Sequence, residues 1–108
     1  MRAQVGTGYL LSGVVRSAVD CSPIPNAQIE FWLAGTQGDY GDEWRATTFT
    51  FADGSYRFES HTPPPYSGRP PHIHIRVSVE SFETLVTQHY PSPGSSQAVF
   101  DLVLAPSL

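Results

Sequence analysis

The sequence contains no lysine and only one cysteine, and both absences exclude classes of function. Its six basic residues are arginines scattered singly, and ten acidic residues bring the formal net charge to −4. A nucleic-acid-binding surface needs a cluster or stripe of basic residues, so we expect no nucleic-acid partner. Cys21 has no second cysteine for an internal disulfide, and nothing in the cysteine usage indicates an oxidising compartment.

Long hydrophobic runs are also missing. No apolar segment approaches the length that spans a bilayer. The first residues lack the apolar stretch of a signal peptide and lead into glycines and a strand-like segment. We therefore expect a cytoplasmic protein with no membrane partner.

Turn-forming residues are abundant instead. The 108 residues include ten prolines and nine glycines, and 40% of the chain is hydrophobic, which is enough to form a core. No repeat, charge block or low-complexity linker divides the chain. The sequence predicts a single turn-rich domain over residues 1–108.

Hydrophobic residues alternate with polar ones, which is the period of β-strands. In residues 27–33 three apolar side chains share one face, and Trp32 lies on the other face with two polar residues. Residues 72–80 alternate in the same way. Further strands are expected at residues 9–15, 45–51, 55–59, 84–90 and 98–104, separated by Pro- and Gly-containing turns. The pattern predicts an all-β protein, an antiparallel β-sandwich of seven to eight strands.

The residues His72 and His74 form the most suggestive local pattern. Residues i and i+2 of a strand share a face and lie roughly 6.6 Å apart, so two imidazoles could converge on one metal ion. Pairs of this kind are also common on solvated strand faces with no metal. Two ligands leave a site incomplete, so any further donors must come from elsewhere in the chain.

Few other side chains are candidate donors. Cys21 lies in a Pro-rich turn and is expected to be a small, at least half-buried residue. His61 and His89 could also serve, but each stands alone in the sequence, as a surface or loop-end histidine does. Tyr40 and Tyr66 occupy loops without core-facing periodicity, where they either cover the ends of the sheets or serve as ligands.

Other polar and aromatic residues are expected to be structural. Glu30 and Trp32 belong to the polar face of their strand, and Tyr56 alternates with a phenylalanine as a core residue does. Arg76 shares the face of the two histidines, where either a substrate contact or a salt bridge with Glu80 would occupy it.

Several short motifs, taken in their order along the chain, resemble the intradiol ring-cleavage dioxygenases, from about residue 8 to residue 104. The most specific is an Arg-Pro-x-His-Ile-His run, preceded by a Pro-Tyr pair and, further upstream, by a tyrosine eight residues after a tryptophan. All the motifs, in chain order, are Ser12-Gly13-Val14-Val15, Ser22-Pro23-Ile24-Pro25-Asn26-Ala27-Gln28-Ile29-Glu30-Phe31-Trp32, Gly38-Asp39-Tyr40, Asp53-Gly54-Ser55-Tyr56-Arg57-Phe58, Pro65-Tyr66, Arg69-Pro70-Pro71-His72-Ile73-His74 and Thr87-Gln88-His89-Tyr90.

The resemblance implies a β-sandwich that holds a mononuclear non-haem Fe(III) through Tyr40, Tyr66, His72 and His74. The donor set is chemically sensible, because two phenolates match a hard, highly charged ion better than thiolates would. A free tyrosine has a pKa near 10, so the metal itself makes tyrosinate available at neutral pH.

The resemblance also implies the reaction, in which O2 cleaves a catechol-type diol between its hydroxyl-bearing carbons to give a muconate-type diacid. Tyr40 matches the tyrosinate that stays on the metal, and Tyr66 matches the one that leaves and takes a substrate proton. Arg69 matches an arginine that stabilises negative charge on the attacked ring carbon. Gln88 matches a glutamine near that arginine.

Departures from the family pattern bear on turnover and substrate choice. Only two residues separate Tyr66 from Arg69, where the family carries a longer loop, and the chain starts close to its first strand, without the N-terminal helical region of catechol dioxygenases. The stretch before the Asp53-Gly54 turn also departs from the family's Thr-Asp pattern, a change expected to be structural. At 108 residues the chain is expected to be close to the bare metal-bearing sandwich, and a homo-oligomer would supply missing substrate walls from a neighbouring subunit.

Two alternatives stay open. One is a non-catalytic, transthyretin-like β-sandwich that keeps the motifs for packing or binding. The other keeps the metal but binds a catechol without cleaving it.

Overall fold

The computed structural model describes residues 3–34, 44–63, 71–92 and 94–107, and they form β-strands joined by turns. Across these residues no helix is long and apolar enough to cross a membrane. The strands, in chain order, are β1 (Ala3–Gln4), β2 (Tyr9–Ser17), β3 (Gln28–Leu33), β4 (Arg45–Phe49), β5 (Ser55–Ser60), β6 (Ile73–Ser78), β7 (Leu85–His89), β8 (Gln97–Val99) and β9 (Leu102–Leu104).

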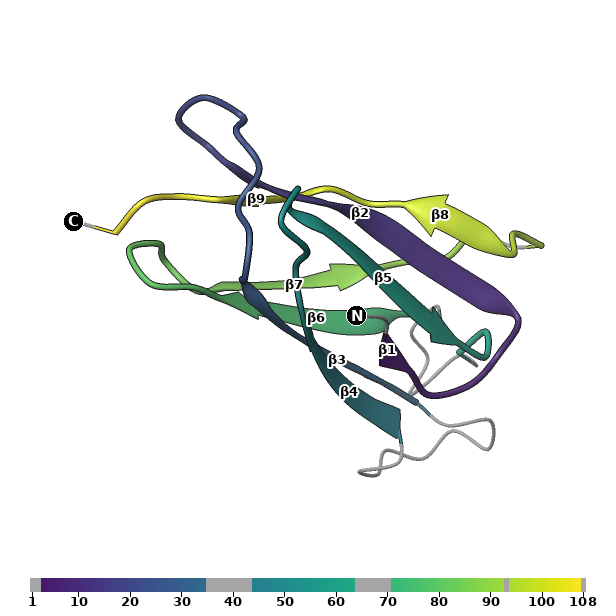
Figure 1. The fold of residues 1–108 in the computed structure, drawn as a ribbon. Helices are drawn as coiled ribbons and strands as arrows, with labels where there is room; N and C mark the ends of the chain where they lie inside the picture. Colours follow the sequence, from purple (N-terminus) through teal and green to yellow (C-terminus); the bar gives the residue numbers. More distant parts are fainter. Residues whose placement is uncertain (1–2, 35–43, 64–70, 93, 108) are drawn as a thin grey trace.

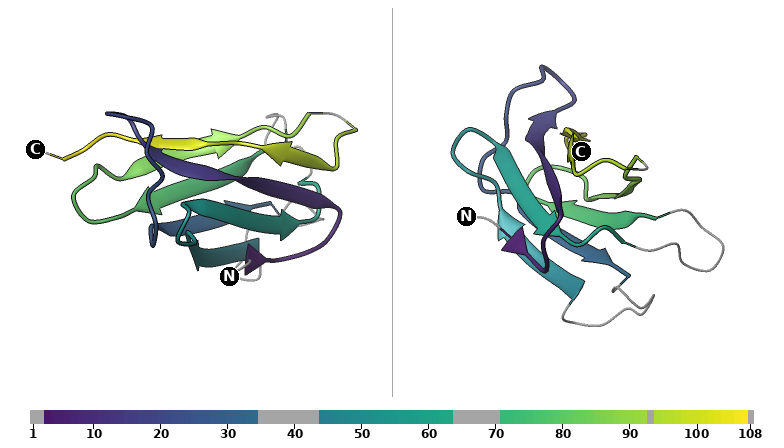
Figure 2. Two further views of the ribbon diagram at one scale, coloured as in Figure 1. Left: turned by 45° about the horizontal axis from the view of Figure 1, so that its top comes forward. Right: turned by 90° about the vertical axis from the view of Figure 1, so that its right-hand side faces the viewer.

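These strands form two sheets stacked as two layers (Figure 1, Figure 2). The first sheet has the order β1-β5-β2-β8, with β9 also paired to β2, and the second has the order β4-β3-β6-β7. All pairs in the second sheet are antiparallel, whereas β1, β8 and β9 pair in parallel with their neighbours in the first. The all-β sandwich predicted from the alternation is confirmed. The three parallel pairs depart from the expected antiparallel arrangement, and the described residues form nine strands rather than seven to eight.

The core lies between the sheets and is made by the inward-facing residues of each alternating strand. Phe31 of β3 stacks on Phe58 of β5, with ring centroids 4.2 Å apart and planes 6° from parallel. Tyr56 is fully buried beside Phe31, as expected. The other fully or almost fully buried apolar side chains are Tyr9, Leu11, Val15, Ala27, Ile29, Leu33, Ala34, Ile73, Ile75, Val77, Leu102 and Leu104.

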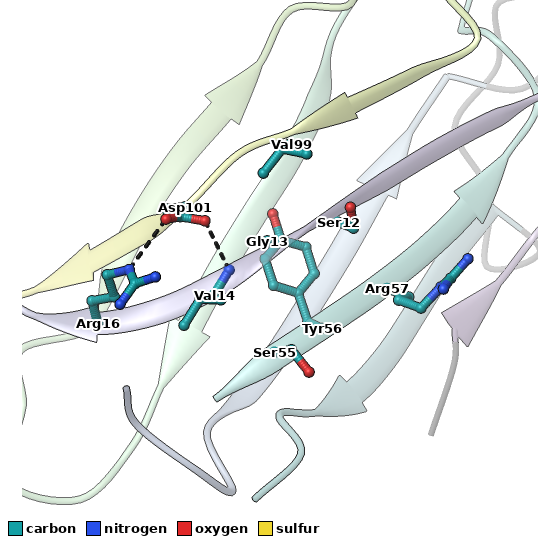
Figure 3. Close-up of a pocket in the computed structure, with 9 residues that line it drawn as sticks. All are labelled: Ser12, Gly13, Val14, Arg16, Ser55, Tyr56, Arg57, Val99 and Asp101. Atoms are coloured by element: carbon teal, nitrogen blue, oxygen red, sulfur yellow. Dashed lines mark hydrogen bonds and ion pairs between the residues drawn. The ribbon is translucent and has the colours of Figure 1, made fainter. Parts of the chain in front are cut away.

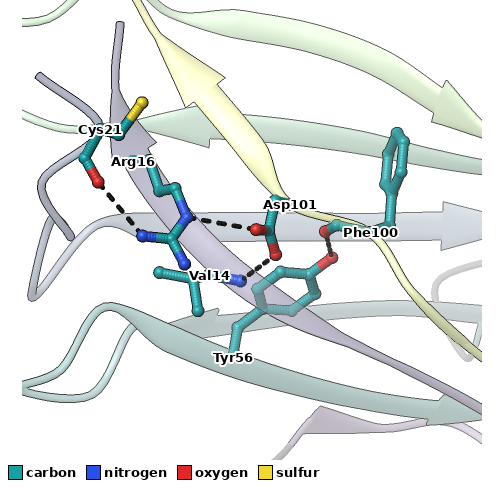
Figure 4. Close-up of polar contacts among 6 residues, drawn as sticks. All are labelled: Val14, Arg16, Cys21, Tyr56, Phe100 and Asp101. Carbon is teal, nitrogen blue, oxygen red and sulfur yellow. Dashed lines mark hydrogen bonds and ion pairs between the residues drawn. The ribbon is translucent and has the colours of Figure 1, made fainter. Parts of the chain in front are cut away.

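The last predicted strand, residues 98–104, is broken into β8 and β9 at Phe100 and Asp101. The Phe100 N–H donates to the Ser12 carbonyl at 2.7 Å, and the Tyr56 hydroxyl donates to the Phe100 carbonyl (Figure 4). A Cβ on Gly13 would lie 2.3 Å from the Phe100 oxygen, so only glycine permits this close approach. The break therefore depends on contacts with β2 and β5.

Two expectations for single residues are wrong. Cys21 is exposed, because its turn projects beyond β2 with a backbone φ of 63°. Arg76 contacts Glu30 of β3 at 3.8 Å rather than Glu80, since β3 and β6 are antiparallel neighbours and the register places Glu30 directly opposite Arg76.

Candidate functional site

The candidate site lies where β3 ends, β6 begins and β7 ends. The pairs Leu33↔Ile73 and Ile73↔His89 bring these three strand ends together. Pro71 has no backbone N–H for a strand ladder, and pairing starts two residues after it. His72 therefore lies immediately before β6, and His74 is its second residue.

The two histidines lie against each other, as the spacing predicts. Their ring centroids are 4.8 Å apart, and their planes are 79° from parallel. His72 is buried, with 2% of its surface exposed, and His74 is half-buried. Ligand nitrogens lie about 2 Å from a bound metal, so two imidazole centres on one ion lie roughly 4.5–5 Å apart. The pair is thus compatible with two ligands of one metal.

A row of side chains crosses the outer face of the second sheet at His74. The register places Arg45 of β4 opposite Trp32 of β3, Trp32 opposite His74, and His74 opposite Gln88 of β7. The indole of Trp32 and the imidazole of His74 are parallel within 3°, with centroids 5.1 Å apart. The Arg45 guanidinium carbon lies 5.5 Å from the centroid of the Trp32 ring.

Gln88 is oriented by Tyr90. The Tyr90 hydroxyl donates to Gln88 Oε1 at 2.7 Å, and the Tyr90 ring centroid lies 6.0 Å from that of His72. With the amide oxygen accepting from a phenol, the amide nitrogen is the end of Gln88 that donates to other partners. Tyr90 thereby joins Gln88 to the neighbourhood of the histidine pair.

The other two histidines have different contacts. His89 Nε2 is 2.8 Å from the Tyr9 hydroxyl, and this hydrogen bond joins β7 to β2 across the sandwich. Burial lowers the pKa of His89 below its ordinary value, and burial raises the pKa of Tyr9. His61 Nε2 lies 2.9 Å from the Ala34 carbonyl oxygen. Neither residue joins the pair formed by His72 and His74.

The remaining predicted site residues, Tyr40, Tyr66 and Arg69, lie outside the described residues. Within the described ranges, no group of three or more His, Cys, Asp or Glu side chains could hold a metal ion. The predicted ligand set has two histidines and two tyrosines, so such a group is not required by it. Of all the predicted site residues, the structure brings together His72 and His74 and places Gln88 opposite His74.

Trp32 and Tyr90 are neighbours of the histidine pair that sequence reasoning did not assign to the site. The signal for Trp32 was present: the alternation puts this large aromatic residue on the polar face of its strand. For Tyr90 the sequence offers only its position two residues after Gln88, which places both on one face of an extended segment.

A separate hollow of about 450 Å³ lies on the outer face of the first sheet (Figure 3). Two of its charged residues contact each other and the backbone: Asp101 accepts hydrogen bonds from the Val14 N–H at 2.9 Å and from Arg16 Nε at 3.2 Å. The Arg16 guanidinium also donates to the Cys21 carbonyl (Figure 4). These contacts hold the broken strand against β2, so they have a structural explanation.

Comparisons with known proteins agree with the resemblance seen in the motifs. The chain is 30% identical to a chlorocatechol 1,2-dioxygenase of Cupriavidus pinatubonensis over 107 residues, covering 75% of this chain and 42% of the relative. It is 36% identical to a hydroxyquinol 1,2-dioxygenase of Corynebacterium glutamicum over 91 residues, covering 61% of this chain and 30% of the relative. The chain therefore resembles the intradiol dioxygenases in sequence. No family model matches the sequence.

Solved structures agree on the fold. The dioxygenase domain of a dioxygenase carbohydrate-binding protein fusion from Streptomyces sp. SirexAA-E superposes with a TM-score of 0.84 and 28% identity, covering 98% of this chain and 88% of that one. The present chain spans less than half the length of the two curated enzymes above. Its extent is instead close to that of the solved dioxygenase domain, so a domain of nearly this size has a precedent among proteins named as dioxygenases.

Proposed function

We propose that this chain binds Fe(III) through His72, His74, Tyr40 and Tyr66 and uses O2 to cleave a catechol-type diol. In that reaction the bond between the two hydroxyl-bearing carbons breaks, and both atoms of O2 enter the two carboxyl groups of the product. The observation that carries the proposal is the perpendicular imidazole pair at the start of β6, 4.8 Å between centroids, in a chain that resembles ring-cleaving dioxygenases in sequence.

The histidines contribute neutral nitrogen donors from a rigid element. His74 is paired on both sides within β6, by the ladders to β3 and β7, and His72 is the residue directly before this strand. Phenolates from Tyr40 and Tyr66 would complete a donor set suited to a hard trivalent cation. When bound, ferric iron supplies the Lewis acidity that makes an electron-rich diol reactive toward O2.

The remaining residues act on protons and charge. The Tyr66 phenolate oxygen accepts a proton from a substrate hydroxyl, which makes the diol a better electron donor. The Arg69 guanidinium stabilises the negative charge that develops on the attacked ring carbon. Gln88, with its oxygen held by Tyr90, presents its amide nitrogen as a hydrogen-bond donor on the strand next to His74.

Oxygen uptake tests the proposal directly. The iron-loaded protein is mixed in turn with catechol, protocatechuate and hydroxyquinol, and O2 consumption and product absorbance are followed. We expect uptake with at least one diol and a red colour in the resting protein, from tyrosinate-to-ferric charge transfer. A His74→Gln variant is expected to lose both, whereas His61→Gln, a matched change at the same end of the sandwich, keeps both.

Two results would contradict the proposal in different ways. A colourless protein with stoichiometric iron would exclude tyrosinate ligands. A red protein that consumes no O2 with any of the three diols would contradict ring cleavage. It would favour the alternative in which the chain keeps the metal and binds catechols without cleaving them.

A further inference from the structure

Three side chains from three neighbouring strands form one stack on the outer face of the second sheet. Trp32 of β3 lies directly opposite Arg45 of β4 and, on its other side, opposite His74 of β6. Because β4 and β6 flank β3, the guanidinium and the imidazole lie on opposite sides of the indole. The order in space is therefore Arg45, Trp32, His74.

The geometry of the stack fixes the plane of the imidazole. The rings of Trp32 and His74 are 3° from parallel at 5.1 Å, and the guanidinium carbon of Arg45 is 5.5 Å from the indole centroid. The face of an indole carries partial negative charge, so Arg45 is attracted to it and restrains the ring from the far side. His74 also meets the edge of the His72 ring at 79°, so it has a ring neighbour in two directions.

A histidine needs such a restraint in order to be a good ligand. The torsion between Cβ and the imidazole ring is broad, so the backbone alone does not set the plane of the ring. In many metal sites a hydrogen bond to the second ring nitrogen sets it, and losing that partner costs metal affinity. An offset-stacked indole can do the same by van der Waals contact with part of the face of the ring.

We propose that Trp32, backed by Arg45, is a positioning residue that holds the His74 imidazole in the plane required for metal ligation. This rests on the proposed function, because it takes His74 to be a ligand. The positioning role goes beyond the proposed function, because it assigns a task to two residues that contribute no ligand atom. The competing explanation is that Trp32 and His74 are a cross-strand pair that only stabilises the sheet.

The first measurement needs no metal. Stacking on an indole shifts the carbon-bound imidazole protons of His74 upfield in the NMR spectrum, and His74→Gln identifies those resonances. We expect the shift to persist in Trp32→Phe and Arg45→Gln and to vanish in Trp32→Leu. An unshifted His74 resonance in the wild-type protein would show that the stack does not form in solution and would overturn the proposal.

The second measurement uses ferric nitrilotriacetate as the iron source for the full chain. We expect Trp32→Leu to weaken iron binding by about 10- to 100-fold, the range found for residues that support metal ligands. Its high-spin ferric electron paramagnetic resonance signal should also broaden, since the histidine plane is no longer fixed. Trp32→Phe should restore most of the affinity, and Arg45→Gln should lose about two- to five-fold.

Trp44→Leu is the matched control, because the Trp44 ring packs at 80° and 5.0 Å against His61, which is not one of the proposed ligands. It should leave the affinity and the resonance signal unchanged, and the free energy of unfolding of each variant is measured alongside. If wild-type protein binds iron and Trp32→Leu binds it equally tightly with the same signal, the positioning role is wrong and the proposed function stands. If the wild-type chain takes up no iron, both fail.

Discussion

The two outer faces of the sandwich use their polar side chains differently. On the second sheet, Arg45, Trp32 and His74 contact one another in a single cross-strand row, with Gln88 next along it. On the first sheet, the charged group of Asp101 contacts Arg16 and a backbone N–H. One face joins side chains across four strands beside a histidine pair, and the other joins one ion pair to the backbone at a strand break.

This difference separates a structural hollow from a candidate site. The hollow on the first sheet has volume and charge, but its Arg16 and Asp101 already hold the β8–β9 break against β2 (Figure 3, Figure 4). The histidine pair, in contrast, has a geometry that suits a shared ligand. Substitutions on the first sheet should therefore change the free energy of unfolding without changing iron affinity. Substitutions in the row on the second sheet should change iron affinity without changing the free energy of unfolding.

Gly13→Ala should have the largest effect on stability. The new Cβ would lie 2.3 Å from the Phe100 oxygen and 2.8 Å from its carbonyl carbon, and both are backbone atoms that cannot rotate away. We expect the free energy of unfolding of the metal-free protein to fall by about 3 kcal/mol, measured by urea denaturation. Iron affinity of the folded fraction should not change.

Ser12→Ala, at the neighbouring position on the outer side of β2, is the control and should change stability by less than about 0.5 kcal/mol. A Gly13→Ala protein as stable as the wild type would mean that the strand break is not held by this close approach. The structural explanation given above for the hollow on the first sheet would then be wrong.

Asp101 should have a smaller effect that depends on which atom is removed. Asp101→Ala loses the acceptor of the Val14 N–H and should cost about 1–2 kcal/mol. Asp101→Asn keeps a carbonyl oxygen for Val14 and loses only the charge facing Arg16. Because the two side chains are 36% and 40% exposed, that ion pair is worth less than about 1 kcal/mol. Equal losses in the two variants, by urea denaturation, would contradict the assigned role of the backbone contact.

His89 predicts a pH dependence for the contact that joins the sheets. Burial lowers its pKa in the folded state below the ordinary value near 6.5, so the unfolded chain takes up this proton first as the pH falls. Stability of the metal-free protein should fall below about pH 6.5 and level off below the folded pKa. Thermal midpoints between pH 5 and 8 should fall less in His89→Gln. Parallel curves for the two proteins would show that His89 is not the group responsible.

The sequence was sufficient for the strands and for the histidine pair, because both depend on the period of two. Alternation in residues 27–33 and 72–80 places Phe31 and Ile75 in the core, and the same alternation brings His72 and His74 together. These features are local: each follows from the strand in which it lies.

Features that depend on which strands are neighbours could not be predicted in this way. The stack of Arg45, Trp32 and His74 requires the order β4-β3-β6, and nothing in the three segments specifies that order. The break at Phe100 interrupts a segment whose alternation continues, because it is imposed by the close approach to Gly13 on another strand. Tyr40, Tyr66 and Arg69 remain predictions from the motifs.

The smallest expected effect is that of the ion pair between Arg76 and Glu30, which lies on the same face as the row, two residues further along β6. The two groups are 3.8 Å apart, and their side chains are 51% and 32% exposed, so solvent screens their attraction. A double-mutant cycle with Arg76→Gln and Glu30→Gln should give a coupling of about 0.5 kcal/mol or less, with iron affinity unchanged. Because Arg76 is directly opposite Val86 and not Gln88, the cycle tests whether the functional row is confined to one register. A change in iron affinity as large as that expected for Trp32→Leu would mean that the whole outer face of the second sheet, and not a single row of it, supports the histidine pair.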